Sequence, residues 1–284
     1  MRIIFSRKGF DSTSGGKPSP ILPDGRIVSF PIPDKQSSIR YNDIRWQEYN
    51  LGSFVSDLTG GRIPGSYFAH LDPDLSKDSL SRSPDWKPLL GQTGAAQGHL
   101  RKNGVRAVDI FLFFGLYQNV ILSSGKLEWD TRSPRRHLLW GWLQIDEAVK
   151  VDGCNLSKFE WARYHPHFQR EPDANNTIYV ARKYLALPGV SSKGLFGSGV
   201  FSHISEGLVL TDPDGTTPSE WKLPRWFYPC EGKFPLTYHS DLARWQKTDN
   251  AVRLRAVARG QEFILNTEEF PEAVEWLKEL IECR

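Results

Sequence analysis

The sequence has few of the residues that disulfide frameworks, cysteine-based metal modules and membrane proteins require. Its three cysteines, Cys154, Cys230 and Cys283, lie far apart and form no CxxC pair, so neither a zinc knuckle nor a disulfide framework is indicated. No stretch approaches the roughly 18 apolar residues of a membrane span, and the apolar run after Met1 is too short for a signal peptide. We therefore expect a cytoplasmic protein without a membrane partner.

The fingerprints of several common catalytic classes are also missing. The sequence contains no Walker loop, Rossmann glycine pattern, HExxH, GxSxG or zinc-deaminase signature. Nucleoside triphosphate hydrolysis, hydride transfer and zinc chemistry are therefore disfavoured, and we expect no cofactor.

Positive and negative charges nearly balance, since the formal net charge of the 284 residues is only +3. So small a value does not indicate a basic coat for long duplex DNA, although a local patch is compatible with it. The densest basic cluster comprises Arg132, Arg135 and Arg136. One interpretation is a solvated loop. The other is contact with the DNA backbone, because guanidinium groups bind phosphate through two parallel hydrogen bonds.

Aromatic residues are abundant, with 10 Trp, 9 Tyr and 16 Phe. Large aromatics bury much area in a core, and they also stack on bases that have left a helix. The composition thus suits both a packed core and a pocket for a nucleobase.

Three unbroken apolar runs predict fully buried strands at 109–115, 137–145 and 176–181. Apolar residues spaced by three and four positions predict a helix over 270–283. Shorter elements are expected as strands at 2–5, 26–33, 208–211, 252–258 and 262–265, and as helices at 43–58 and 95–100. We expect an α+β, β-rich fold: one domain over 1–284, with a central mixed or barrel-like sheet and a C-terminal helix.

Two short motifs offer atoms that could bind a metal ion. His165-Pro-His167 places two imidazoles two residues apart, but no further ligand is obvious nearby, so a turn with ordinary histidines is favoured. Asp72-Pro-Asp74 supplies two carboxylates on a long loop. Magnesium takes such oxygens, yet Asp-Pro turns are common. We expect no metal site.

Asp11, close to Arg7, Lys8 and Ser12, is the best candidate for a catalytic carboxylate. A base-excising enzyme needs a carboxylate near the sugar, to stabilise oxocarbenium charge or to activate water. Cationic neighbours would keep that carboxylate ionised. The alternative is an Asx turn at the end of a strand.

Polar side chains set among small residues form a second group of candidates. Gln92, Gln97 and His99 alternate with glycine and alanine, which let a flat ligand come close. A carboxamide both donates and accepts hydrogen bonds, so it can read the pairing edge of a base. The alternative is a loop-to-helix junction. Glu262, beside Gln261, is the second carboxylate candidate, although its alternation with apolar neighbours equally suits an outward strand residue.

Several polar, glycine-rich segments together resemble the third nucleotide-modification-associated domain family, from residue 2 to about residue 281. They are 6–12, 15–16, 18–25, 70–75, 91–100, 141–144 and 259–263. The family is associated with base-modification systems of phages and bacteria, so the resemblance implies DNA carrying modified bases as the partner. Anti-phage DNA glycosylases that excise glucosylated cytosines are similar in role.

A second, shorter resemblance covers 108–114 and 139–145. These segments are similar to core strands of PUA-like modified-base readers such as EVE domains, which are small β-barrels that hold a flipped base in an aromatic cage. In this chain, Trp140 or Trp142 would stack on the extruded base.

The resemblances lead to three functional hypotheses. In the first, a DNA glycosylase flips a modified base and cleaves its N-glycosidic bond, with Asp11 as the carboxylate and Arg7 and Lys8 on phosphate. The remaining candidates for its pocket are Ser12, Gln92, Gln97, His99 and Gln261. In the second, a non-catalytic reader uses the same pocket. In the third, an enzyme modifies free nucleotides.

Overall fold

The computed structural model describes residues 1–258, 260 and 262–282. A large mixed sheet dominates it, with the strand order β16-β1-β8-β10-β11-β7. These strands are β1 (Arg2–Arg7), β7 (Leu89–Gln92), β8 (Ile110–Ser123), β10 (Arg136–Lys150), β11 (Thr177–Ala181) and β16 (Glu262–Asn266). Beside this path, β8 also pairs with β2 (Ser19–Ile21) and β9 (Lys126–Trp129), and β10 with β12 (Ser198–Val200).

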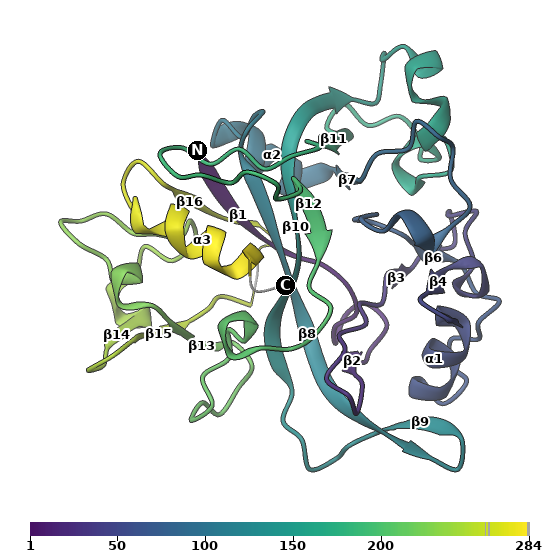
Figure 1. Cartoon of the computed structure of the whole chain (residues 1–284), viewed down its shortest axis with the longest axis horizontal. Coiled ribbons are helices and arrows are strands. Elements are labelled where there is room, and N and C mark those ends of the chain that lie inside the picture. The colour runs from purple at the N-terminus through teal and green to yellow at the C-terminus, as the bar shows by residue number, and fades with distance from the viewer. Residues whose placement is uncertain (259, 261, 283–284) are drawn as a thin grey trace.

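The two longest strands, β8 and β10, run antiparallel through the middle of the molecule (Figure 1). Both carry unbroken apolar runs, and side chains on both of their faces are buried. β1 lies parallel to β8 and antiparallel to β16, which places Arg7 opposite Phe114 and Ser6 opposite Glu262. The polar residues that end β1 therefore lie directly beside the most deeply buried part of the sheet.

Smaller elements lie to either side of the long strands (Figure 1). The C-terminal side carries α3 (Glu272–Glu282) and a three-stranded sheet of β13 (Glu220–Leu223), β14 (Trp245–Lys247) and β15 (Val252–Arg255). The N-terminal side carries α1 (Leu51–Leu58), the pair β3 (Ile32–Pro33) and β6 (Ala69–His70), and the pair β4 (Arg45–Trp46) and β5 (Tyr49–Asn50). The remaining α-helix is α2 (Gly94–Lys102). Short 3₁₀ helices span Tyr41–Asp43, Lys77–Ser79, Leu156–Ala162, Pro166–Phe168, Glu206–Leu208, Arg225–Phe227 and Leu242–Arg244.

The α+β, β-rich fold with a mixed sheet and a C-terminal helix is confirmed. The barrel-like alternative is wrong: β16 and β7 stand at opposite ends of the main strand order, so the sheet described here is open. Three expected strands were also wrong in extent. Only Ile32–Pro33 of 26–33 and only Val252–Arg255 of 252–258 belong to a strand, and none of 208–211 does. None of the described helices is long and apolar enough to cross a membrane.

Candidate functional site

A polar cavity of about 200 Å³ opens where β1 and β7 end. Its wall combines residues just after β1, the segment at β6, the end of β7 and the segment around Pro166–Phe168. The charged and imidazole side chains that line it are Arg7, Lys8, Asp11, His70, Asp72, His167 and Arg170. We call this space the polar cavity.

Asp72 is the central carboxylate of the polar cavity. Its Oδ1 accepts a hydrogen bond of 2.6 Å from the backbone N–H of Gly91, and its Oδ2 lies 3.5 Å from Lys8 Nζ. Burial alone would raise the pKa of this carboxyl, but Lys8, followed by His165 and His167, holds it well below its ordinary value. Asp72 is therefore an ionised carboxylate in a buried position.

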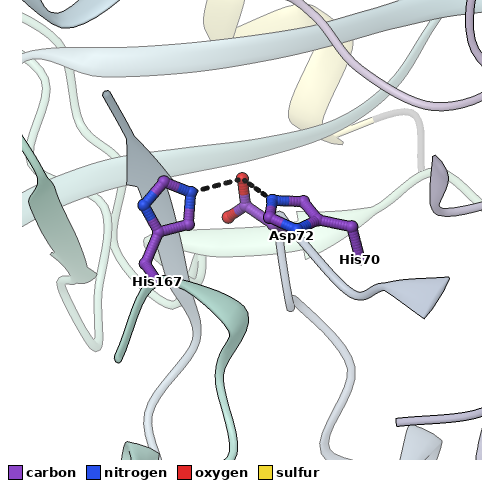
Figure 2. Close-up of side chains that lie close together, drawn as sticks. All are labelled: His70, Asp72 and His167. Carbon is purple, nitrogen blue, oxygen red and sulfur yellow. Dashed lines mark ion pairs between the residues drawn. The ribbon is translucent and has the colours of Figure 1, made fainter. Parts of the chain in front are cut away.

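Three histidines surround this carboxylate. The Nε2 atoms of His70 and His167 each lie 3.8 Å from Asp72 Oδ2, as the dashed lines in Figure 2 mark. His165 Nε2 lies 3.3 Å from the other oxygen, Oδ1. Burial lowers the pKa of His167 to about 3, so this ring is neutral at pH 7.

The outer nitrogens of two of these rings are fixed by polar partners. His70 Nδ1 lies 2.8 Å from Asp34 Oδ2, and His167 Nδ1 lies 2.7 Å from Asn176 Oδ1. Gly91 packs directly on the His167 ring, where a Cβ atom would lie only 2.2 Å from it. The two imidazoles are thus held with Nε2 toward Asp72.

The sequence presented these residues as separate motifs. His165 and His167 had no further ligand near them in sequence, which was the reason to expect no metal site, but the fold brings Asp72 and His70 to them. The Asp72-Pro-Asp74 motif, in contrast, does not act as a pair. Asp74 is bound by Arg82 at 2.6 Å and by the Tyr164 hydroxyl at 2.7 Å.

A second, mainly apolar cavity of about 240 Å³ adjoins the polar cavity. Gly9 and Asp72 line both cavities. The aromatic side chains on the wall of the second cavity are Phe30, Trp46, Trp140 and Phe201. We call it the aromatic cavity. A space for a flat apolar group thus lies next to a space lined by charges.

Comparison with known proteins identifies the family. The family model described as "Nucleotide modification associated domain 3" matches residues 2–266. The chain belongs to this family. No curated protein and no solved structure matches it. Membership connects the chain with nucleotide modification and leaves the reaction open.

Asp11, the carboxylate selected from the sequence, lies on the wall of the polar cavity. Its Oδ1 accepts hydrogen bonds of 2.7 Å from the backbone N–H groups of both Thr13 and Ser14, which is the Asx turn considered from the sequence. Ser12 is exposed within this turn and is not among the residues that line the cavity. Arg7 lines the cavity, but its guanidinium donates to the backbone carbonyls of residues 257 and 258.

Glu262 lies behind the polar cavity instead of on its wall. Its Oε1 accepts hydrogen bonds from Ser6 Oγ at 3.1 Å and from Gln92 Nε2 at 2.5 Å. Burial raises the pKa of this carboxyl, although Lys8 opposes the shift. Glu262 therefore positions the amide of Gln92, which does line the cavity. Gln261, the neighbouring candidate, lies outside the described residues, as does Arg259.

The other two candidates of the glycine-rich segment, Gln97 and His99, make contacts with other side chains of the protein. Gln97 Oε1 accepts a hydrogen bond of 2.9 Å from the Tyr179 hydroxyl. The His99 ring stacks on Tyr238, with centroids 4.4 Å apart, and its Nε2 lies 3.0 Å from Thr237 Oγ1. Neither Gln97 nor His99 lines either cavity.

The two tryptophans proposed for stacking have different surroundings. Trp142 is completely buried, packs against Phe201, and donates its Nε1 hydrogen to the backbone oxygen of Phe196. The geometry assigns it to the core. Trp140 lines the aromatic cavity, and its buried Nε1 has no hydrogen-bond partner among the described residues. Trp46 lines the same cavity, although no motif in the sequence pointed to it.

The basic cluster lies apart from both cavities. Arg132 is 89% exposed, and its Nε lies 3.5 Å from Asp130. Arg135 and Arg136 line a separate groove of about 850 Å³, together with acidic residues such as Asp212. As far as the described residues show, no lining residue of this groove belongs to the polar cavity.

Proposed function

We propose that the chain binds one modified nucleotide of DNA across the two cavities and cleaves its N-glycosidic bond, as a DNA glycosylase. One observation carries the proposal: an aromatic cavity and a cationic, carboxylate-containing cavity meet at Gly9 and Asp72. A nucleotide has the same division, with a flat base at one end and an anionic sugar-phosphate at the other. Membership of a nucleotide-modification-associated family supports a modified base as the target.

The aromatic cavity suits a base that has left the helix. A glycosidic bond cannot be approached inside stacked DNA, so the nucleotide must be flipped out first. Trp46 and Trp140 offer aromatic surface for stacking, which contributes roughly 1–3 kcal/mol per base. Neither cavity alone reaches the roughly 300 Å³ of an ordinary ligand pocket. We therefore place the nucleotide across both cavities, whose volumes together exceed this figure.

The polar cavity supplies the groups that act on the sugar and phosphate. Lys8, which lies 3.5 Å from Asp72, and Arg170, which lies 3.6 Å from Asp34, line it and offer cations for phosphate. Arg7 is held by hydrogen bonds to backbone carbonyls. Of the two carboxylates on this wall, Asp11 is the closer to solvent, because Asp72 is buried. We assign to Asp11 the stabilisation of oxocarbenium charge or the activation of water. Its turn, with two backbone N–H groups on one oxygen, fixes the carboxylate without consuming the other oxygen.

The test uses the purified chain with phage DNA that carries glucosylated cytosine and with the same DNA unmodified. The proposal predicts abasic sites and released modified base only from the modified DNA. Asp11→Asn should reduce product at least 100-fold while the affinity for modified DNA changes little. Ser12→Ala, in the same turn but exposed, is the matched control and should retain activity.

Each contrary outcome has a distinct meaning. Tight binding of modified DNA without any product would overturn the glycosylase proposal and support a non-catalytic reader of modified bases. Full activity of Asp11→Asn would remove Asp11 from its role. Product from free modified nucleotides, with none from DNA, would support the nucleotide-level enzyme instead.

A further inference from the structure

We propose that His70, Asp72 and His167 form a binding site for one divalent first-row transition metal ion, with Zn²⁺ as its simplest probe. The inference goes beyond the proposed function, because base excision by Asp11 requires no metal. It rests on the three ligand atoms, on how their other ends are held, and on one buried nitrogen next to them.

The ligand atoms are close enough to share an ion. One donor atom from each of the three residues lies within 4.8 Å of the other two. Two atoms bound to the same zinc lie at most about 4.2 Å apart, because zinc–nitrogen and zinc–oxygen bonds are about 2.0–2.2 Å long. That limit holds for ligands on opposite sides of the ion, whereas ligands of a tetrahedral zinc site lie about 3.3–3.6 Å apart. Binding therefore requires the most widely separated donor atoms to close in by about 1.3 Å. At 3.8 Å, the two Nε2 atoms are too far from Asp72 Oδ2 for hydrogen bonds to it.

The second layer of contacts orients the ligands. A metal-bound histidine almost always donates its other N–H to a carboxylate, carbonyl or amide oxygen. His70 Nδ1 has Asp34, and His167 Nδ1 has Asn176, so we assign the ring protons to Nδ1 and the lone pairs to Nε2. Gly91 donates to Oδ1 of Asp72 and leaves Oδ2 toward the two rings. One nitrogen of each ring thus faces the same Asp72 oxygen, and the three donor atoms form one cluster (Figure 2).

An independent observation at the same place is the state of His165. Its ring is fully buried, and Nε2 has no hydrogen-bond partner among the described residues. This nitrogen lies 3.3 Å from Asp72 Oδ1. A buried polar atom without a partner is costly unless something else satisfies it. Because His165 Nδ1 accepts a hydrogen bond from the His167 backbone N–H, Nε2 carries the ring proton, and a water molecule bound to the metal ion would give this N–H a partner.

Lys8 is the group that a metal ion must replace. Its Nζ lies 3.5 Å from Oδ2, the same oxygen that faces the two rings. In the metal-free protein, the ammonium group balances the charge of the buried Asp72. An ion on Oδ2 would repel Lys8, so the two cations compete for one carboxylate. Removing the ammonium group should therefore strengthen metal binding.

The donor set selects a class of ion. Imidazole nitrogens suit zinc, iron and similar transition metals, whereas magnesium and calcium prefer sites made of oxygens. Among the described residues, the cluster takes one donor atom from each of three side chains, and all three residues line the polar cavity. A site with three protein ligands and an open side toward a cavity is the arrangement of catalytic metal sites, in which water or substrate completes the coordination.

The test is calorimetric titration of the full-length chain, stripped with a chelator, first with Zn²⁺ and then with Mg²⁺. We expect one equivalent of Zn²⁺ with micromolar or tighter affinity and no comparable uptake of Mg²⁺. His70→Ala and His167→Ala should each weaken Zn²⁺ binding more than tenfold, and Asp34→Asn should weaken it about tenfold or more through the orientation of His70. His203→Ala removes an exposed histidine and should leave the affinity unchanged.

A second variant protects the test against misfolding. Lys8→Met keeps all ligands and should bind Zn²⁺ more tightly than the wild type. Absence of stoichiometric Zn²⁺ binding in both the wild type and Lys8→Met would overturn the site, as would equal affinities of the wild type, His70→Ala and His167→Ala. Since no DNA is present, metal binding and base release fail or succeed independently.

Discussion

Glu262 supports the polar cavity indirectly, because it holds Gln92 on the cavity wall without lining the cavity itself. Its Oε1 holds Ser6 and Gln92, while Oε2 is buried without a hydrogen-bond partner among the described residues. The sequence offered two interpretations, an outward strand residue or a second catalytic carboxylate. The outward strand residue is wrong, because β16 pairs with β1 and turns this side chain into the protein behind the polar cavity. The catalytic role stays a prediction.

The burial of Glu262 predicts a pH dependence of stability. Burial raises its folded-state pKa above the unfolded value of roughly 4.3, against the opposing charge of Lys8 and together with that of Asp72. The resulting stability is fully present below the unfolded pKa and is lost as pH rises through the folded pKa. Glu262→Gln stays neutral, so its free energy of unfolding should exceed that of the wild type at pH 8 by about 1.4 kcal/mol per unit of pKa shift.

Urea unfolding at pH 5 and pH 8 measures this difference, with the exposed Glu268→Gln as control. Parallel pH profiles for the wild type and Glu262→Gln would show that burial does not perturb this carboxyl.

Two tryptophans predict opposite mutant behaviour. Trp142 is fully buried, so Trp142→Ala should cost about 3–5 kcal/mol of unfolding free energy. Trp46 is only half-buried and lines the aromatic cavity, so Trp46→Ala should cost about 1 kcal/mol and weaken binding of a modified nucleotide about tenfold. Thermal unfolding and fluorescence titration check the pair. Normal nucleotide binding by Trp46→Ala would argue against the aromatic cavity as the place of the base.

Some candidate residues are positioned by contacts with sequence neighbours, and others by contacts with residues far away along the chain. Asp11 could be assigned to an Asx turn from sequence, because Thr13 and Ser14, which hold it, are its neighbours. The role of Asp72 could not, because its partners Lys8 and His167 lie far away along the chain. Sequence spacing carries no signal for contacts that only the tertiary fold creates.

At the scale of elements, the end of β7 controls the geometry of the polar cavity. Gly91 donates its N–H to Asp72 and faces the His167 ring at a distance that leaves no room for a Cβ atom. The strand thus sets two of the three proposed metal ligands at once. A glycine is required here by close approach.

This close approach predicts the effect of a single methyl group. Gly91→Ala should destabilise the protein by about 1–3 kcal/mol through overpacking and should weaken Zn²⁺ binding, because His167 must move. Gly98→Ala is the matched control: its Cβ would meet nothing within 4 Å in α2, so it should stabilise by about 0.5–1 kcal/mol. Differential scanning calorimetry and zinc titration measure both. A Gly91→Ala protein with normal stability and zinc affinity would contradict the described packing.

The long strands were predictable because their burial on both faces leaves a clear apolar run. The runs at 109–115 and 137–145 became β8 and β10, and the spacing near the C-terminus gave α3. The helix expected over 43–58 begins only at Leu51, because the β4–β5 hairpin occupies its first half and Asn50 caps the helix by accepting from Ser53 N–H. Pairing within this short local hairpin overrides the helix propensity of its residues.

At the scale of the whole molecule, the positions of the cationic side chains say more about DNA binding than the net charge does. The formal charge of +3 is small, and the dense cluster at Arg132, Arg135 and Arg136 lies away from the polar cavity. Two cations line the polar cavity and are the expected phosphate contacts: Lys8, which is paired with Asp72, and Arg170, which is paired with Asp34. We therefore expect the protein to bind one nucleotide tightly and to make few contacts with the DNA backbone on either side of it.

This arrangement predicts a shallow salt dependence. With about two phosphates neutralised, log K for a modified oligonucleotide should fall with log salt at a slope of roughly −2. Arg170→Ala should reduce the slope by about 1, whereas Arg135→Ala should leave it unchanged. Fluorescence anisotropy between low and moderate salt measures the slopes. A steep slope that Arg135→Ala reduces would place the DNA on the separate groove.

The most direct test of the account is a crystal structure of the chain with a modified nucleoside monophosphate. We predict the base in the aromatic cavity beside Trp46 and Trp140, and the phosphate in the polar cavity within reach of Lys8 and Arg170. A nucleotide bound instead in the groove lined by Arg135 and Arg136, with both cavities left free of it, would contradict the account.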